Sequence, residues 1–233
     1  MREPPVLRQS WQHLAFLHWE VAPDVLAPQV PRDLEIDTFE GRAFVTVVPF
    51  TIEGLLSFHE INVRTYVHRG GRDPGVWFFS LDAASRLAVA GARVAYKLPY
   101  FFARIAMQVG EGGAVTYRAR RLGRPARAPR GAEPPRFACT YAPAGPAAEA
   151  RPGTLEAFLV ERYLLYAGDS RRLRTARVHH PPYPLQPATV TDLDQTLTLE
   201  AGLPPSTTPP LCHYASRVDV RIDLPHRAHP LAP

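Results

Sequence analysis

Four polar side chains alternate along one otherwise apolar stretch, and their types suit them to chemistry. Residues 58–67 read Phe-His-Glu-Ile-Asn-Val-Arg-Thr-Tyr-Val. In a β-strand, alternate side chains share a face, so Glu60, Asn62, Arg64 and Tyr66 would line one side of the strand. A carboxylate, an amide and a guanidinium are unfavourable to bury unless they pair with one another or line a cavity. We therefore predict that these residues form the wall of an internal site.

This wall offers the groups needed to bind a small polar or carboxylate ligand. Arg64 can hold a carboxylate through its planar fork of N–H donors, and Glu60 can act as a general acid or base. Asn62, Tyr66 and His18 are candidate ligand-binding residues on the same or a neighbouring strand. The alternative interpretation of the same pattern is a purely structural ladder of paired polar groups inside a barrel.

Lys97 is the only lysine, so every other basic side chain among the 27 is an arginine. Arginine does not form a Schiff base, and amine chemistry would therefore require Lys97 or the terminal amine. A buried Lys97 beside apolar or cationic groups would be a candidate catalytic amine. The alternative is an exposed lysine at a helix end, where it favours the negative pole of the helix dipole.

Other site chemistries find no support in the sequence, and neither a cofactor nor a metal is expected. His179 and His180 are adjacent, so in an extended chain they point to opposite faces and do not readily share one metal ion. No catalytic serine elbow, glycine-rich phosphate loop or paired-cysteine zinc spacing is present. Cys139 and Cys212 are the only cysteines, and we expect free thiols in a reducing compartment.

Composition indicates a globular protein, with 45% hydrophobic and 21% charged residues in 233. No apolar run is long enough to span a membrane and the first residues do not resemble a signal peptide, so the expected location is cytoplasmic. The net charge of +5 comes largely from arginines in and around a Pro- and Gly-rich segment at about 122–135. With few aromatic residues to stack on bases, this segment is predicted to be a flexible loop and nucleic acid is not an expected partner.

The regions around the polar wall are predicted to be strands joined by tight turns. β-rich runs with turn residues between them predict hairpins over 34–50, 60–81 and 101–120. Prolines at 23 and 31 bound a short helix. Pro49 is expected to end its strand or to lie at a sheet edge, because it cannot donate a ladder hydrogen bond. Further strands are predicted over 11–21, 173–178, 188–193 and 211–224.

Two longer helices are predicted from their capping residues. Asp82 can cap a helix that runs to about residue 95, and Thr154 can cap one that runs to about residue 166. Many hairpin strands with two or three helices indicate an α+β protein whose antiparallel sheet curls into a barrel or cone. Because neither half of the chain supplies a closed set of strands, we expect a single domain over residues 1–233.

Short motifs spread over nearly the whole chain carry a family resemblance. They are Phe-Leu-His-Trp at 16–19, Leu-Glu-Ile-Asp at 34–37, Val-Pro-Phe at 48–50, Glu-Ile-Asn-Val-Arg-Thr-Tyr at 60–66, Phe-Phe-Ser-Leu-Asp at 78–82, Leu-Pro-Tyr at 98–100, Phe-Leu-Val-Glu-Arg-Tyr at 158–163 and His-Pro-Pro-Tyr-Pro-Leu at 180–185. Together they resemble the YqjF-like group of bacterial proteins, related in fold to acetoacetate decarboxylase. The resemblance implies a cone-shaped antiparallel β-barrel that encloses a small-molecule cavity, in a homo-oligomer.

The resemblance carries over only part of the decarboxylase machinery. In acetoacetate decarboxylase, two lysines follow an Ala-Tyr-Pro sequence; one forms the Schiff base and its neighbour lowers its pKa. Here the matching stretch at 95–99 is Ala-Tyr-Lys-Leu-Pro, so Lys97 falls one position early and has no second lysine. Glu60, which follows Phe58-His59, matches one cavity glutamate. The other glutamate and the arginine of the family fall near Val45 and His13, so neither is retained.

Two functional hypotheses follow. In the first, the protein is a lyase-like enzyme acting on a small oxo-acid or other carboxylate, with Glu60 as acid or base, Arg64 as the carboxylate clamp and Lys97 as the amine. In the second, the same wall holds a small ligand without catalysis. Loss of the lysine pair favours the second hypothesis.

Overall fold

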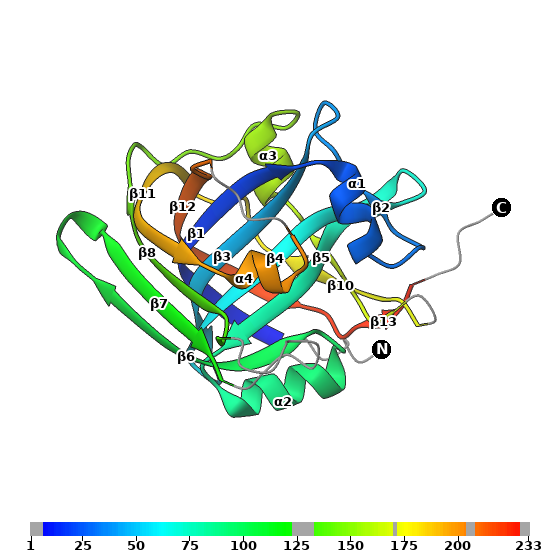
Figure 1. The fold of residues 1–233 in the computed structure, drawn as a ribbon, viewed down its shortest axis with the longest axis horizontal. Helices are drawn as coiled ribbons and strands as arrows, with labels where there is room; N and C mark the ends of the chain where they lie inside the picture. The colour runs from blue at the N-terminus through cyan, green and yellow to red at the C-terminus, as the bar shows by residue number, and fades with distance from the viewer. Residues whose placement is uncertain (1–6, 123–132, 170–171, 204–207, 229–233) are drawn as a thin grey trace.

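Long, paired β-strands dominate the computed structural model, which describes residues 7–122, 133–169, 172–203 and 208–228 (Figure 1). The strands are β1 (Leu7–Val21), β2 (Glu35–Ile36), β3 (Ala43–Gly54), β4 (Phe58–Arg69), β5 (Arg72–Ala83), β6 (Tyr100–Val109), β7 (Val115–Arg121), β8 (Arg136–Pro143), β9 (Leu164–Ala167), β10 (Arg174–His179), β11 (Leu185–Gln195), β12 (Leu211–Ile222) and β13 (His226–Arg227). The α-helices are α1 (Pro23–Leu26), α2 (Arg86–Ala95), α3 (Leu155–Val160) and α4 (Leu197–Glu200), and two 3-10 turns cover Ala27–Gln29 and Glu111–Gly113.

The strands close into a barrel. Hydrogen-bonded pairs run from β5 through β4, β3, β1, β12, β10 and β9 back to β5. Most of these pairs are antiparallel, and the β5–β9 pair is parallel. A second path between β5 and β12 runs through β6, β7, β8 and β11, and forms a sheet beside the barrel. The predicted α+β fold with a curled sheet is confirmed.

In β1, β3 and β4, the period-2 alternation divides the side chains between two cores. Phe16 of β1 and Phe50 of β3 belong to a cluster inside the barrel. Leu17 of β1 and Ile61 and Val63 of β4 belong to a second cluster, which also contains side chains of β7 and β8. Strands β3 and β4 are therefore buried on both faces, which is why their burial is continuous over most of their length rather than alternating.

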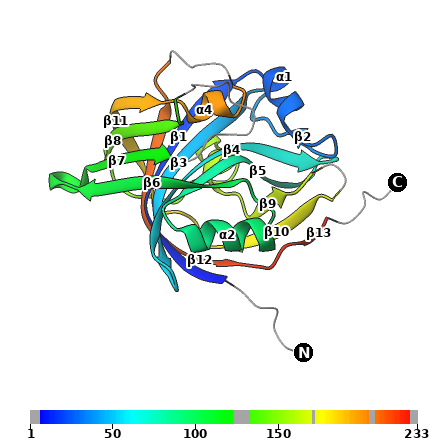
Figure 2. The ribbon, with the colours of Figure 1, turned by 60° about the horizontal axis from the view of Figure 1, so that its bottom comes forward.

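The helix α2 lies across one opening of the barrel, framed by β12 on one side and by β4 and β5 on the other (Figure 2). It is capped by Ser85, whose side chain accepts a hydrogen bond from the backbone N–H of Ala88. The prediction that Asp82 caps this helix is wrong. Asp82 lies within β5, where its buried carboxylate pairs with Arg121 of β7 instead.

Pro49 lies inside β3, so the prediction that it ends a strand or occupies an edge is also wrong. The register between β1 and β3 shifts between Gln12 and Leu17, opposite this proline. Within the shifted segment His13 has a positive φ of 53°. This local irregularity has the form of a β-bulge, and a bulge tolerates a residue that lacks a ladder donor.

The helix after Thr154 is shorter than predicted. Thr154 does cap it, but α3 ends at Val160 and the chain re-enters the barrel as β9. Residues 164–167 pair with both β10 and β5, and this tertiary pairing overrides the helical spacing of their apolar side chains. Strand β8 was not predicted from the sequence.

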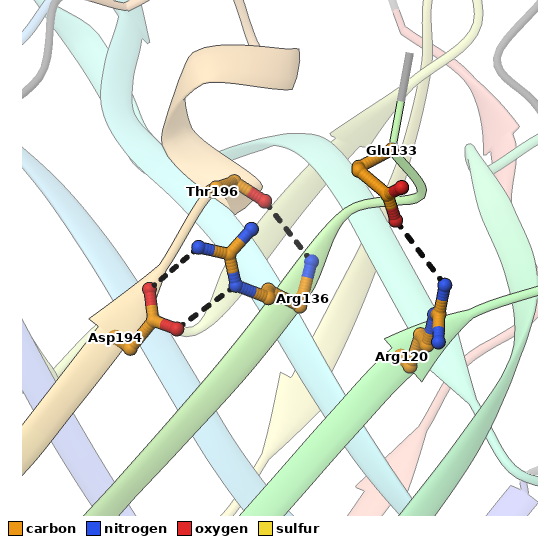
Figure 3. Close-up of polar contacts among 5 residues, drawn as sticks. All are labelled: Arg120, Glu133, Arg136, Asp194 and Thr196. Carbon is orange, nitrogen blue, oxygen red and sulfur yellow. Dashed lines mark hydrogen bonds and ion pairs between the residues drawn. The ribbon is translucent and has the colours of Figure 1, made fainter. Parts of the chain in front are cut away.

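The predicted Arg- and Pro-rich loop lies largely outside the described residues, since 123–132 are not described. The chain on either side of it is held by polar contacts (Figure 3). Arg120 pairs with Glu133 at 3.3 Å, and Arg136 pairs with Asp194 at 2.9 Å. The backbone N–H of Arg136 also donates to the Thr196 hydroxyl at 3.0 Å.

Candidate functional site

Strand β4 carries the predicted polar wall. Glu60, Asn62, Arg64 and Tyr66 are only 2%, 5%, 8% and 0% exposed, respectively. The intervening Ile61 and Val63 face the other core. Because a carboxyl, an amide and a guanidinium here are almost entirely removed from bulk water, each depends on protein partners or on a ligand for its hydrogen bonds.

The wall borders a cavity of about 310 Å³ inside the barrel. Glu60, Asn62 and Arg64 all line it, whereas most of the remaining lining is apolar. The volume lies at the lower end of the range typical of small-molecule sites, about 300–1,000 Å³, and such sites combine an apolar lining with a few convergent polar groups. The apolar lining includes Leu14, Phe16, Val48, Phe50, Ile52, Phe78, Leu81 and Leu98.

Glu60 is held as a neutral acid near pH 7. Burial raises the pKa of its carboxyl from the ordinary 4.5 to about 8, although hydrogen bonds from Tyr100 and Asn62 act in the opposite direction. The Tyr100 hydroxyl donates to Oε2 of Glu60 at 2.8 Å. A protonated carboxyl can donate a hydrogen bond, so Glu60 can both give and take a proton within the cavity.

Arg64 is a buried cation without an acidic partner within the described ranges. Its Nη2 donates one long hydrogen bond of 3.4 Å to the carbonyl of Leu159, and its Nε has no partner. The guanidinium lies 5.6 Å from the ring centre of Phe16 and 5.9 Å from that of Tyr66. Aromatic faces stabilise a cation only partly, so this arrangement favours an incoming anion.

A second arginine, Arg162, lines the same cavity and was not predicted as a site residue. Its Nη1 pairs with Asp37 at 2.6 Å, and its guanidinium lies 5.2 Å from the Tyr66 ring centre. Two buried guanidiniums therefore lie near the Tyr66 ring, and only that of Arg162 has a carboxylate partner, Asp37, among the described residues. Tyr100, the partner of Glu60, was also missed. Tyr100 and Arg162 belong to the motifs Leu-Pro-Tyr and Glu-Arg-Tyr. Nothing in the sequence indicates that these motifs approach β4.

Tyr66 and His18 were predicted to bind ligand, but neither is among the cavity-lining residues. The Tyr66 hydroxyl donates to the Leu159 carbonyl at 2.7 Å and lies 2.6 Å from the Thr46 hydroxyl. Thr46 in turn lies 2.8 Å from Nδ1 of His18. Burial, with the nearby His213 and Arg64, lowers the pKa of His18 well below its usual value. The structure thus brings these two residues together in a buried polar chain behind the wall.

Lys97 does not lie with Glu60 and Arg64, the residues with which the first functional hypothesis grouped it. Its side chain is exposed and does not line the cavity, whereas Tyr96 and Leu98 on either side do. The helix α2 ends at Ala95, and Lys97 follows with a φ of 58°. This left-handed turn redirects the chain into β6 and leaves the amine of Lys97 in solvent. Of the two alternatives that the sequence left open for Lys97, the structure shows the exposed lysine near a helix end.

The Lys97→Arg variant tests this placement. We expect the variant to bind carboxylates within about twofold of the wild type, because substitution of an exposed side chain away from a site perturbs little. We also expect borohydride reduction in the presence of pyruvate or acetoacetate to leave the peptide containing Lys97 unmodified, as measured by mass spectrometry. A reduced adduct on Lys97 that disappears in Lys97→Arg would contradict the assigned geometry.

The part of the chain that the structure describes offers no support for a metal site, a membrane-spanning helix or a reactive cysteine. There, no group of three or more His, Cys, Asp or Glu side chains is arranged to hold a metal ion. None of the helices there has the length and apolar character that crossing a membrane requires. Cys139 and Cys212 are buried and free, and burial raises the pKa of both thiols. Neither is therefore suited to act as a thiolate nucleophile.

The closed barrel of this protein has the acetoacetate decarboxylase-like fold. Acetoacetate decarboxylase from Legionella pneumophila subsp. pneumophila str. Philadelphia 1 superimposes with a TM-score of 0.67 at 14% identity, covering 97% of this chain and 88% of the other. The enduracididine biosynthesis enzyme MppR, complexed with the condensation product of pyruvate and imidazole 4-carboxaldehyde, superimposes with a TM-score of 0.66 at 14% identity. This match covers 97% of this chain and 90% of the MppR chain.

Sequence similarity assigns the family within this class. The chain is 36% identical over 226 residues to the uncharacterized protein YqjF of Bacillus subtilis (strain 168), covering 92% of this chain and 89% of that protein. The profile of the family DUF2071, described as an uncharacterized conserved protein, matches residues 8–219. The chain belongs to the DUF2071 family. The resemblance to YqjF-like proteins inferred from the motifs is confirmed.

Proposed function

We propose that this protein binds a small carboxylate inside the barrel and that Glu60 exchanges a proton with the bound molecule, as in a lyase-like enzyme. The observation that carries the proposal is the buried guanidinium of Arg64, which lines the cavity without an acidic partner among the described residues. A carboxylate would supply the two acceptors that match its fork of donors. Assembly into a homo-oligomer and a cytoplasmic location remain predictions from the sequence.

The spacing along β4 indicates where the ligand's groups would lie. Arg64 is four positions after Glu60, which places their Cα atoms roughly 13 Å apart on an extended strand. A ligand whose carboxylate meets Arg64 would therefore reach Glu60 with a second polar group further along its skeleton. Asn62 lies between the two and has an unpaired side-chain oxygen that can accept a hydrogen bond from such a ligand.

An oxo group is the second polar group that best suits Glu60. The neutral carboxyl can donate to a carbonyl oxygen, and after ionisation it can accept a proton from the adjacent carbon. Structures of MppR are described as complexes with pyruvate and with a condensation product of pyruvate. These are properties of MppR, and they support oxo-acids as the first class of probe for this chain.

Titration of the cavity with carboxylates tests the proposed binding. We expect pyruvate, acetoacetate or levulinate to bind the wild type, and Arg64→Met to weaken binding by about 10- to 100-fold, which corresponds to losing a hydrogen bond to a charged group. Calorimetric titration measures the change. Arg104→Met is the matched control, because Arg104 is exposed on β6 and does not line the cavity.

Arg64→Met should not fail merely by unfolding, since it replaces an unpaired buried charge with an apolar side chain of similar length. Its urea midpoint should equal or exceed that of the wild type. Equal affinity of Arg64→Met and Arg104→Met for every carboxylate would refute the proposed binding site.

Binding without catalysis is the second candidate function, and the exposed position of Lys97 favours it. Hydrogen–deuterium exchange separates the two candidates. An enzyme would accelerate exchange at the carbon next to the carbonyl of levulinate, followed by NMR in D₂O, because Glu60 would remove a proton and return a deuteron. Glu60→Gln would abolish that acceleration and retain binding. Binding by the wild type without accelerated exchange would assign the protein to the non-enzymatic class.

A further inference from the structure

The mouth of the cavity is marked by exposed leucines, which the proposed binding of a small oxo-acid does not explain. Leu55 and Leu56 lie in the turn between β3 and β4 and are 95% and 43% exposed, and Leu87 on α2 is 73% exposed. All three also line the cavity. We call these three residues the leucine rim. A large exposed apolar patch continuous with an internal cavity is unusual unless it meets a ligand or partner.

The polar groups and the leucine rim lie at opposite ends of one path along β4. The strand starts at Phe58, directly after the turn that carries Leu55 and Leu56. From there the cavity-lining residues of β4 run Phe58, Glu60, Asn62 and Arg64. Arg64 is six residues from Phe58, or roughly 20 Å along an extended strand. A carboxylate at Arg64 would therefore lie deep in the barrel, far from the leucine rim.

We propose that the natural ligand is an amphiphilic monocarboxylate, whose head is held by Arg64 and whose aliphatic tail runs past Glu60 to the leucine rim. This inference rests on the proposed carboxylate site and names its ligand class. Beside Glu60 and Asn62, the lining includes Leu14, Phe16, Val48, Phe50 and Ile52, whose side chains offer dispersion contacts and no hydrogen bonds.

The helix α2 shapes the exit for such a tail. Ala88, Gly91 and Ala92 of α2 line the cavity beside Leu87, so the helix presents small side chains toward the barrel. Val89 is the one buried residue of this helix. Small residues leave room for a flexible chain to pass between the helix and the β3–β4 turn. Val94, also 73% exposed on α2, does not line the cavity and shows that exposure alone does not define the leucine rim.

A homologous series of alkanoates tests the inference. Butyrate, octanoate, dodecanoate and hexadecanoate are titrated into the wild type at fixed pH and salt. We expect the affinity to rise by about fourfold for each added methylene until the tail reaches the leucine rim, because each buried CH₂ contributes a similar free energy. The intrinsic fluorescence of Trp11, which lines the cavity, gives a second readout.

Leu87→Ser locates the tail. This exposed substitution should leave butyrate affinity unchanged and weaken hexadecanoate binding by about four- to fifteenfold, the loss expected for about one or two buried methylenes. Val94→Ser, the matched control on the same helix, should change neither affinity. Hexadecylamine, which has the tail without the carboxylate, should not compete with hexadecanoate.

The outcomes separate this inference from the proposed function. If short carboxylates bind in an Arg64-dependent way but affinity stays flat along the series, or if Leu87→Ser and Val94→Ser behave alike, the amphiphile inference fails and the carboxylate site stands. If no carboxylate binds, or if Arg64→Met binds them as well as the wild type does, both fail.

Discussion

The Glu60→Gln variant should be more stable than the wild type, and its advantage should grow with pH from about 4.5 to about 8. Glu60 has its pKa raised across that window, mainly by burial. Gln keeps an oxygen that can accept from Tyr100 and removes the ionisable proton. Comparison of the variant with the wild type therefore measures how far the titratable carboxyl of Glu60 lowers the free energy of unfolding.

The direction in which the free energy of unfolding changes with pH follows from proton linkage. Between about pH 4.5 and about pH 8 the unfolded chain has lost the Glu60 proton and the folded chain still holds it, so the folded state binds more protons. The free energy of unfolding of the wild type must then fall as the pH rises through this window. The full difference is on the order of 3–5 kcal/mol, from about 1.4 kcal/mol for each unit of pKa shift.

Urea unfolding of both proteins near each end of this window measures the effect. The difference in free energy of unfolding should be small near pH 5 and reach several kcal/mol near pH 8. Glu111→Gln is the control, because Glu111 is exposed in the β6–β7 turn. A Glu60→Gln advantage that is absent, or that does not change with pH, would mean that Glu60 is ionised in the folded protein at neutral pH.

The polar wall could be predicted from sequence because its pattern is local. Alternation along residues 60–66 fixes which side chains share a face whatever the neighbouring strands are. Tyr100 and Arg162 could not be predicted in the same way. They reach the cavity only through closure of the barrel, 40 and 98 positions along the chain from Glu60 and Arg64 respectively. Such non-local contacts depend on strand order and register, which no single segment encodes.

The wrong capping assignment of Asp82 and the solvent-exposed placement of Lys97 have the same origin. Asp82 precedes a helix and is a favourable capping residue, but a partner 39 residues away, Arg121, takes its carboxylate into the core. Lys97 occupies the stretch in which the decarboxylase carries its amines, yet a left-handed backbone turn decides that its side chain meets solvent. In both cases a tertiary contact or a single dihedral angle overrides a sound local preference.

The buried Asp82–Arg121 pair also influences the site. Nε and Nη2 of Arg121 donate to the two carboxylate oxygens at 2.7 and 2.8 Å, and the two side chains are 1% and 2% exposed. The guanidinium lies 3.9 Å from the ring centre of Phe101. The pair joins β5 to β7, and the Asp82 charge contributes to raising the pKa of Glu60. A structural ion pair thus helps to keep the cavity acid protonated.

Arg121→Met should destabilise the protein by about 3–5 kcal/mol, because it leaves the Asp82 carboxyl buried without its partner. Burial already raises the pKa of Asp82 against the opposing effect of Arg121, so without the arginine that pKa should rise further. The loss of stability should accordingly be larger at high pH than at low pH. Urea unfolding at two pH values measures both effects.

Arg120→Met is the matched control for Arg121→Met, since Arg120 is the neighbouring residue in β7 and its pair with Glu133 is exposed, at 62% and 79%. That substitution should change the free energy of unfolding by no more than about 1 kcal/mol. Asp82→Leu combined with Arg121→Met should recover most of the loss, because an apolar pair of similar volume is often as stable as a buried ion pair. Equal destabilisation by Arg120→Met and Arg121→Met would show that burial adds nothing to this pair. Failure of the double variant to recover would instead show that the bidentate geometry itself is needed to join β5 to β7.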